Sequence, residues 1–140
     1  MAIYQSTNVR DKTAVAGPVS GGQVLTAYAE VTCTAAPSTA DTIQFFYLPA
    51  GARVIGATLE ATDMDTGGPT LTLNIGDAGS AARLFSASTV AQAGTLSSAI
   101  AVTGQGHQFT SKTLITGTAA ANATTPAAGT AMLTVLYTVT

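Results

Sequence analysis

The 140-residue sequence has little charge, no tryptophan and a single cysteine. Only 9% of its residues are charged, far below the ~25% of a typical soluble domain. Cys33 alone excludes an internal disulfide framework and a metal site with several cysteine ligands. Sugar-binding platforms usually present exposed Trp or Tyr side chains, so the absence of Trp counts against a carbohydrate site.

The sequence also lacks basic runs and long apolar runs. It has five Lys and Arg residues in total and a net charge of −2, which leaves no electrostatic footprint for nucleic acid. No stretch of about 18 apolar residues is present to span a membrane. Met1–Asp11 lacks the charged start and apolar run of a secretory signal. We therefore expect synthesis in a cytoplasm, with no nucleic-acid or membrane partner.

The residues that are abundant favour an all-β domain. Hydrophobic residues make up 46% of the chain, and branched threonine suits a pleated sheet. Alternating apolar and polar residues, separated by turn-forming residues, predict eight strands. They are Gln23–Cys33, Thr42–Leu48, Arg53–Thr62, Thr70–Ile75, Ala82–Thr89, Leu96–Val102, Phe109–Thr116 and Ala131–Val139. The pattern predicts an antiparallel two-sheet sandwich of the jelly-roll type, although a barrel or an immunoglobulin-like sandwich has a similar pattern.

Three segments carry more specific predictions. Pro49 and Gly51 indicate a reversal at Leu48–Ala52, so the strands on either side of it are expected to form a central hairpin. Ser88–Ala93 is an alternative short helical turn. Gly117–Gly129 contains no large side chain and is therefore predicted to be a long exposed loop.

The N-terminal segment, residues 1–22, is polar and has no sustained period. We interpret it as an extended arm before a single domain at residues 23–140, with a frayed terminus as the plainer alternative. Tyr4 and Arg10 in this arm are candidate contacts with a partner.

Phe46 and Arg53 are the other candidate contacts. Phe46 lies within three consecutive aromatic residues, so both faces of its strand must be covered. The core covers one face, and the second needs a helix, the N-terminal arm or another subunit; since no helix is predicted, a contact between subunits is a reasonable hypothesis. We therefore predict a homo-oligomer, with a homodimer favoured over a trimer. Arg53 is one of few cations, and its role is left open.

A partial calcium motif is the only metal signature. Asp63, Asp65 and Gly68 match D-x-D-x-x-G, but Gly67 and Asn74 stand where two further oxygen ligands belong. We therefore predict that the two aspartates cap their own loop and that no metal or other cofactor is bound.

No catalytic constellation is visible either. His107 has no acidic neighbour in sequence and is expected to be a solvated loop residue. Cys33 is expected to be a small buried hydrophobe, and Arg83 is expected to brace a turn by pairing with Asp77. The chain is predicted not to be an enzyme.

Three runs carry a resemblance to a known family: FFYLPAGARVIGATLEATDMD, GPTLTLNIGDAGSAARLF and AGTAMLTVLYTV. The chain from about Thr42 to Thr140 resembles the small capsid decoration, or cement, proteins of tailed bacteriophages. The resemblance implies a β-sandwich or jelly roll on the outer surface of an icosahedral capsid. There it would bind the major capsid protein, bridge neighbouring capsomers and stabilise the mature head, as a dimer or trimer without catalytic residues. The main alternative is a carbohydrate- or receptor-binding sandwich on a virion fibre or bacterial surface.

Overall fold

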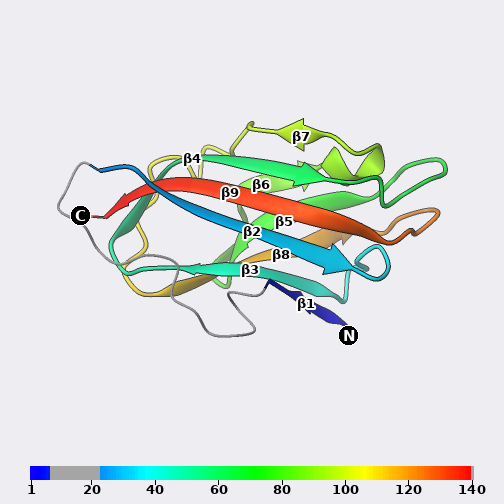
Figure 1. Ribbon diagram of the computed structural model, residues 1–140, viewed down its shortest axis with the longest axis horizontal. Coiled ribbons are helices and arrows are strands. Elements are labelled where there is room, and N and C mark those ends of the chain that lie inside the picture. Colours follow the sequence, from blue (N-terminus) through cyan, green and yellow to red (C-terminus); the bar gives the residue numbers. More distant parts are fainter. Residues whose placement is uncertain (7–22, 140) are drawn as a thin grey trace.

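The computed structural model describes residues 1–6 and 23–139, which form two packed β-sheets (Figure 1). The five-stranded sheet has the order β1-β3-β8-β5-β6 and the four-stranded sheet has the order β2-β9-β4-β7. The first sheet contains β1 (Ile3–Gln5), β3 (Thr42–Leu48), β8 (Thr113–Ala121), β5 (Thr72–Asp77) and β6 (Ser80–Ser88). The second contains β2 (Leu25–Cys33), β9 (Gly129–Val139), β4 (Ala52–Ala61) and β7 (Leu96–Ser97).

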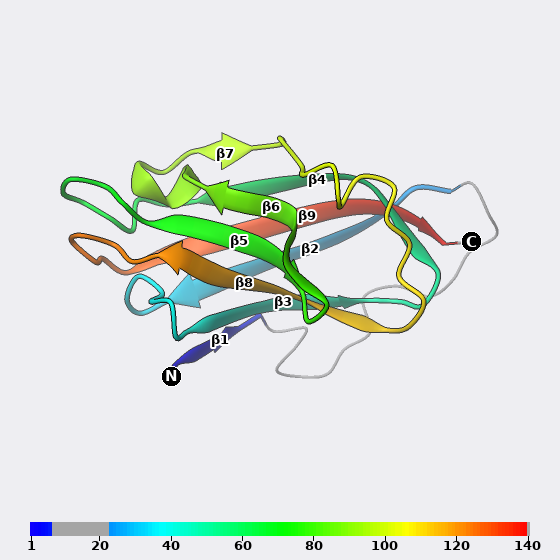
Figure 2. The same cartoon turned by 180° about the vertical axis from the view of Figure 1, so that it is seen from behind.

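The strand order is that of a jelly roll. Early and late strands of the chain interleave in both sheets, so that β9 lies between β2 and β4 while β8 lies between β3 and β5 (Figure 2). These pairs are antiparallel, and β1 is added in parallel at the outer edge of β3. The predicted all-β, two-sheet sandwich is confirmed.

The core fills the space between the sheets and follows the predicted two-residue period. Ala27, Ala29 and Val31 of β2 are buried, and so are Leu133 and Val135 of β9. Successive side chains of a strand point to opposite faces, so the intervening residues of both strands form the outer surface. The short helical turn is present as η1 (Val90–Gln92), which lies between β6 and β7.

The predicted central hairpin is wrong. β3 and β4 are consecutive in sequence, but β3 pairs with β1 and β8, whereas β4 pairs with β7 and β9. The reversal at Pro49 and Gly51 therefore carries the chain from one sheet to the other. Gly51 has a φ of 87°, and the amide of Gly51 donates to the Phe109 carbonyl at 2.7 Å. Turn residues indicate a change of direction, but they do not determine which strand becomes the neighbour.

Phe46 is buried inside the chain and offers no surface to a partner, so its prediction as a contact is corrected. A register shift between Gln44 and Phe46 interrupts the pairing of β3 with β8. Such a bulge breaks the two-residue alternation, and Phe45 and Phe46 both lie in the core, each with 0% exposure. The argument that a second subunit must cover this strand therefore loses its basis.

The predicted exposed loop at residues 117–129 is also wrong in its first part. β8 continues to Ala121 and lies in the middle of its sheet. Its small residues are required there, because a Cβ on Gly117 would lie 3.1 Å from side-chain atoms of both Ile75 and Phe45. Large side chains of neighbouring strands fill the space above β8. Conversely, the strand predicted at Leu96–Val102 is reduced to the two residues of β7.

The hydroxyl of Tyr137 is buried and has no hydrogen-bond partner among the described residues. A buried polar group without a partner destabilises the folded state, so Tyr137→Phe is expected to raise the free energy of unfolding by about 1 kcal/mol. Urea denaturation monitored by circular dichroism would measure this change. Tyr28→Phe, at a half-exposed position, is the control and should change stability little. A loss of stability in Tyr137→Phe would contradict the prediction.

Candidate contact surfaces

The outer face of the four-stranded sheet combines exposed apolar side chains with two carboxylates. Glu30 of β2 and Glu60 of β4 both lie opposite Met132 of β9, so the three residues form one row across the sheet. We refer to this surface as the acidic face. It consists of Val24, Tyr28, Glu30, Ile55, Glu60, Leu96, Met132 and Leu136.

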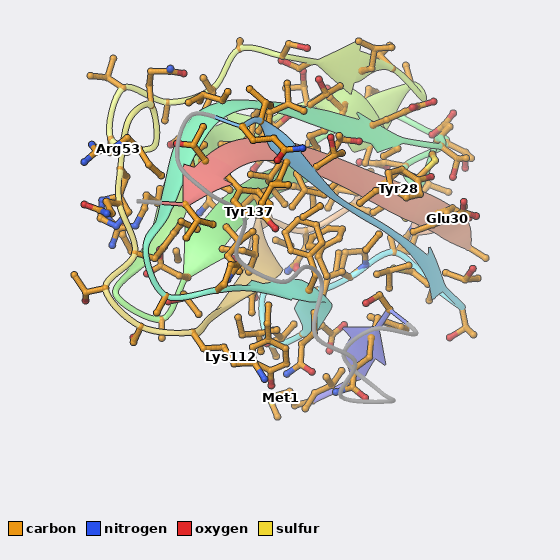
Figure 3. The ribbon with its side chains drawn as sticks, turned by 60° about the vertical axis from the view of Figure 1, so that its left-hand side comes forward. Met1, Tyr28, Glu30, Arg53, Lys112 and Tyr137 are labelled. Carbon is orange, nitrogen blue, oxygen red and sulfur yellow. The ribbon has the colours of Figure 1, made fainter. Side chains whose placement is uncertain are left out.

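Tyr28 lies beside the carboxylates of the acidic face. Its hydroxyl is 3.5 Å from a carboxylate oxygen of Glu30, and half of the residue is exposed. Partial burial raises the pKa of Tyr28, and the charges of Glu30 and Glu60 raise it further. Figure 3 shows Tyr28 and Glu30 close together at one end of the sheet, with Arg53 at the other end. An aromatic ring beside exposed aliphatic groups is typical of a protein contact.

The outer face of the five-stranded sheet has a different chemistry. Its side chains are mainly hydroxyls and amides, from Thr42, Gln44, Asn74, Thr116 and Thr118. An open hollow of about 760 Å³ lies over part of this face. At its margin the Lys112 ammonium lies 4.6 Å from the centre of the Tyr47 ring, a cation–π contact.

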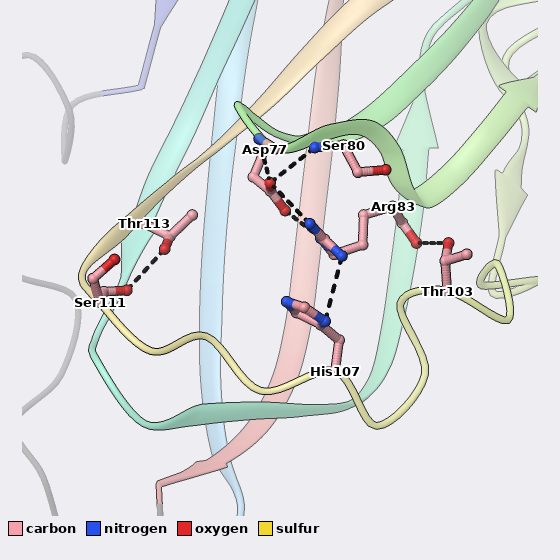
Figure 4. A network of polar contacts seen from close by, with 8 residues as sticks. Asp77, Ser80, Arg83, Thr103, His107, Ser111 and Thr113 are labelled. Carbon is pink, nitrogen blue, oxygen red and sulfur yellow. Dashed lines mark hydrogen bonds and ion pairs between the residues drawn. The ribbon is translucent and has the colours of Figure 1, made fainter.

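A polar network braces the turn between β5 and β6 (Figure 4). The Asp77 carboxylate is buried and pairs with the Arg83 guanidinium at 2.5 Å, and it also accepts the amides of Gly79 and Ser80. Burial acts to raise the pKa of Asp77, but Arg83 and the two amides outweigh it and lower the pKa. The predicted turn-bracing pair is therefore confirmed.

His107 belongs to the same network and is half-buried, which differs from the solvated position predicted. Its Nδ1 lies 3.3 Å from the Arg83 guanidinium, and its ring packs edge-on against Phe109. Burial lowers the pKa of His107 and the charge of Arg83 lowers it further, while Asp77 acts in the opposite direction. The guanidinium separates the imidazole from the carboxylate. The three residues thus lack the arrangement in which an acid orients a histidine base.

Cys33 is fully buried, as predicted. Burial, and after it the charge of Asp41, raises the pKa of the thiol to about 11. A thiol in this environment is protonated at neutral pH and is not a nucleophile.

Asp65 is a buried hub that joins two loops. Its oxygens accept the backbone amides of Thr70 and Leu71 from its own loop, and those of Thr124 and Thr125 from the loop before β9. Burial acts to raise the pKa of Asp65, but the four amides outweigh it and lower the pKa to about 2. These contacts confirm the predicted loop-capping role.

Asp63 completes the capping and accepts the Asp65 amide at 3.0 Å. Within residues 1–6 and 23–139, no group of three or more His, Cys, Asp or Glu side chains comes together as a metal site. The same residues include no helix that is long and apolar enough to cross a membrane.

The three predicted contact residues that the structure describes do not form one surface. Tyr4 of β1 pairs with Ile43 and is partly buried against the core. Arg53 is exposed, but its guanidinium donates to the Gly106 carbonyl and the Gln108 side chain at 2.9 and 3.1 Å, which braces the loop before β8. Phe46 lies in the core. Arg10 lies outside the described residues.

The acidic face was not predicted from the sequence. The alternation of β2 places Tyr28 and Glu30 on an outer surface, but strand neighbours far apart in sequence cannot be identified from periodicity. Glu60 and Met132 join Glu30 only because β9 lies between β2 and β4. The sequence indicated which residues of each strand face outward, but it did not indicate the order of the strands in the sheet.

Comparison with known structures identifies the family. A chain in the capsid asymmetric unit of cyanophage Pam1 is 46% identical, with a TM-score of 0.77, over 93% of the present chain and 96% of that chain. The chain belongs to a family of bacteriophage capsid proteins. A chain from the capsid of Ralstonia phage GP4 is 30% identical to this capsid protein, with a TM-score of 0.85, over 99% and 98% of the two chains.

A more distant likeness concerns the fold alone. A chain from the acid-stable capsid of Helicobacter pylori bacteriophage KHP30 shares 17% identity and a TM-score of 0.52, over 84% of this capsid protein and 89% of that chain. No protein-family model and no curated protein matches the sequence.

Proposed function

We propose that the chain is a capsid decoration, or cement, protein. It binds the outer face of the major-capsid-protein shell, bridges neighbouring capsomers and stabilises the mature head. The supporting observation is the 46% identity, over nearly the full length of both chains, to a chain of a phage capsid asymmetric unit. The resemblance of residues 42–140 to small decoration proteins supports this specific role among the capsid proteins.

The physical properties of the chain fit a structural role without catalysis. Its main buried charged groups are engaged in bracing its own turns and loops, as the contacts of Asp65 and Asp77 illustrate. A low-charge surface can pack against a shell without a large desolvation penalty. Multiple copies on a repeating lattice need only modest affinity when an oligomer engages several sites at once. A homodimer remains our prediction over a trimer, and light scattering in solution would test it.

Binding to capsid shells is the direct test of the proposed function. Purified protein is expected to co-sediment with expanded shells that lack it, and to saturate at a fixed number of copies per shell. Because a ligand that binds only the assembled shell stabilises it, bound shells should withstand a higher temperature than bare shells. At a free concentration of 100 times Kd, the stabilisation is about 2.7 kcal/mol per site. Unexpanded shells provide a comparison, and a lack of binding to shells in either state would overturn the proposal.

A further inference from the structure

The exposed apolar side chains of the described residues concentrate on the acidic face. Most of the large hydrophobic side chains that solvent reaches belong to it, namely Val24, Tyr28, Ile55, Leu96 and Leu136. Leu136 lies between Thr26 and Gly56 in the register of β2, β9 and β4, so its side chain has only small or polar neighbours beside it. A surface of this composition is typical of a protein–protein contact, because aromatic and aliphatic anchors supply most of the binding energy.

The charged residues of the acidic face are Glu30 and Glu60, and the exposed cation on the same side of the sheet, Arg53, lies at the other end of β4. Glu30 and Glu60 are two strand spacings apart, about 10 Å, on either side of Met132. Neither carboxylate has an ion-pair partner within the described residues. Among the described cations, Arg83 pairs with Asp77, while Arg53 and Lys112 contact neutral groups away from Glu30 and Glu60. Within residues 1–6 and 23–139, no cation forms an ion pair with either carboxylate of this face.

This charge decides between possible partners. If two copies of the chain met through the row of Glu30, Met132 and Glu60, the carboxylates of both would come together, and like charges in a contact are unfavourable. Nucleic acid carries the same sign of charge and is excluded for the same reason. A protein surface with Lys or Arg side chains would instead pair with both carboxylates and cover the apolar groups beside them.

We propose that the acidic face binds a surface of the capsid shell that presents Lys or Arg side chains between apolar groups. Tyr28 and Leu136 are the apolar anchors of this contact, and Glu30 and Glu60 orient it. This inference rests on the proposed function, since the shell is the partner that the function supplies.

The test compares two double variants in shell co-sedimentation over a range of salt concentrations. Glu30→Gln with Glu60→Gln removes both carboxylates from the acidic face. Ala81→Lys with Ala120→Lys raises the net charge by the same amount at exposed positions of the other sheet. We expect the first variant to bind shells about tenfold more weakly, which corresponds to the loss of roughly 1.4 kcal/mol, and with a weaker dependence on salt. The second should bind as the wild type does.

A third variant tests the apolar part of the contact. Leu136→Asp places another negative charge among the anchors and is expected to weaken shell binding. Because Leu136 is only 39% exposed and lies in a central strand, the variant is also expected to melt a few degrees lower while remaining folded. Melting temperatures of all variants separate lost binding from lost folding.

Each outcome has a distinct meaning. If the wild type binds shells and the Glu30→Gln/Glu60→Gln variant binds equally well, this inference is overturned while the proposed function stands. Equal weakening of both double variants would show an effect of net charge alone and would also overturn it. A change in oligomeric state without a change in shell binding would make the face a contact between copies. If the wild type itself does not bind, the proposed function fails.

Discussion

Asp65→Ala is expected to lower the melting temperature by about 10 °C, which is a large effect for a domain of this size. The carboxylate accepts four backbone amides, two from the loop after β4 and two from the loop before β9. Its removal leaves these amides without partners in a buried position and separates the two loops. Differential scanning calorimetry at neutral pH would measure the change.

Asp63→Ala is the matched control, because Asp63 lies in the same loop, is exposed and, among the described residues, accepts the Asp65 amide alone. Its melting temperature should fall by only a few degrees, about 2–4 °C. Equal losses in both variants would contradict the role of Asp65 as the hub of the two loops.

The pH dependence gives a second readout of Asp65. Its pKa is about 2 in the folded protein and would be near 3.9 in an unfolded chain. A lowered pKa contributes stability that is fully present above the unfolded pKa and is lost as the pH falls through the folded pKa. The difference in melting temperature between wild type and Asp65→Ala should therefore be constant above about pH 5 and shrink between about pH 4 and pH 2. A difference that stays constant down to pH 2 would contradict the lowered pKa.

Gly76→Ala is expected to destabilise the chain by about 3 kcal/mol or to prevent folding. A Cβ at this position would lie 2.1 Å from the Ser80 carbonyl oxygen and 2.7 Å from the carbonyl group of Ala81. These atoms belong to the backbone of the adjacent strand, so they cannot turn away as a side chain would. The β5–β6 hairpin would have to open, next to the pair formed by Asp77 and Arg83. Urea denaturation would measure the loss, and soluble yield would report a failure to fold.

Gly56→Ala serves as the control for the added methyl group. Gly56 also lies in a strand, but the nearest atom to its Cβ would be a Leu136 methyl at 3.9 Å, an ordinary contact. The two variants add the same group, so the difference between them isolates the close approach of the backbone. If Gly76→Ala were as stable as the wild type, the geometry of this hairpin would be wrong.

The sequence predicted those parts of the fold that local periodicity determines. The buried and exposed faces of β2 and β9 follow from strict alternation, and an all-β fold follows from about eight short strands without helices. The same pattern did not separate a jelly roll from a barrel or an immunoglobulin-like sandwich. Periodicity is a property of one strand at a time. It does not specify which strands become neighbours, and this is why the turn at Pro49 was interpreted as part of a hairpin.

Two further errors have a common physical cause. The composition of a segment was taken to decide its burial, but burial also depends on the size of the side chains on the neighbouring strands. β8 is rich in small residues and is nevertheless central, because Phe45 and Ile75 occupy the space that its own side chains leave free. Phe46 was predicted to contact a partner because three consecutive aromatic residues require cover on both faces of a strand, but a bulge in β3 turns Phe46 into the core.

The acidic face likewise depends on the order of the strands in the sheet. Tyr28 and Glu30 were already placed on the polar side of their strand by alternation. The row that joins Glu30 to Met132 and Glu60 arises only when β9 separates β2 from β4. A single sequence thus indicates which residues face outward better than it indicates which of them lie side by side.

The central position of β9 also sets the order of events during synthesis. β2 and β4 both pair with β9, and they do not pair with each other. Until residues 129–139 leave the ribosome, β2 and β4 lack the strand that lies between them. Their backbone edges are then unpaired, and unpaired edges can form hydrogen bonds with other chains. The four-stranded sheet therefore cannot form completely before residues 129–139 have left the ribosome. A nascent chain stalled before residue 129 should remain sensitive to protease, whereas one that has exposed Val139 should become resistant.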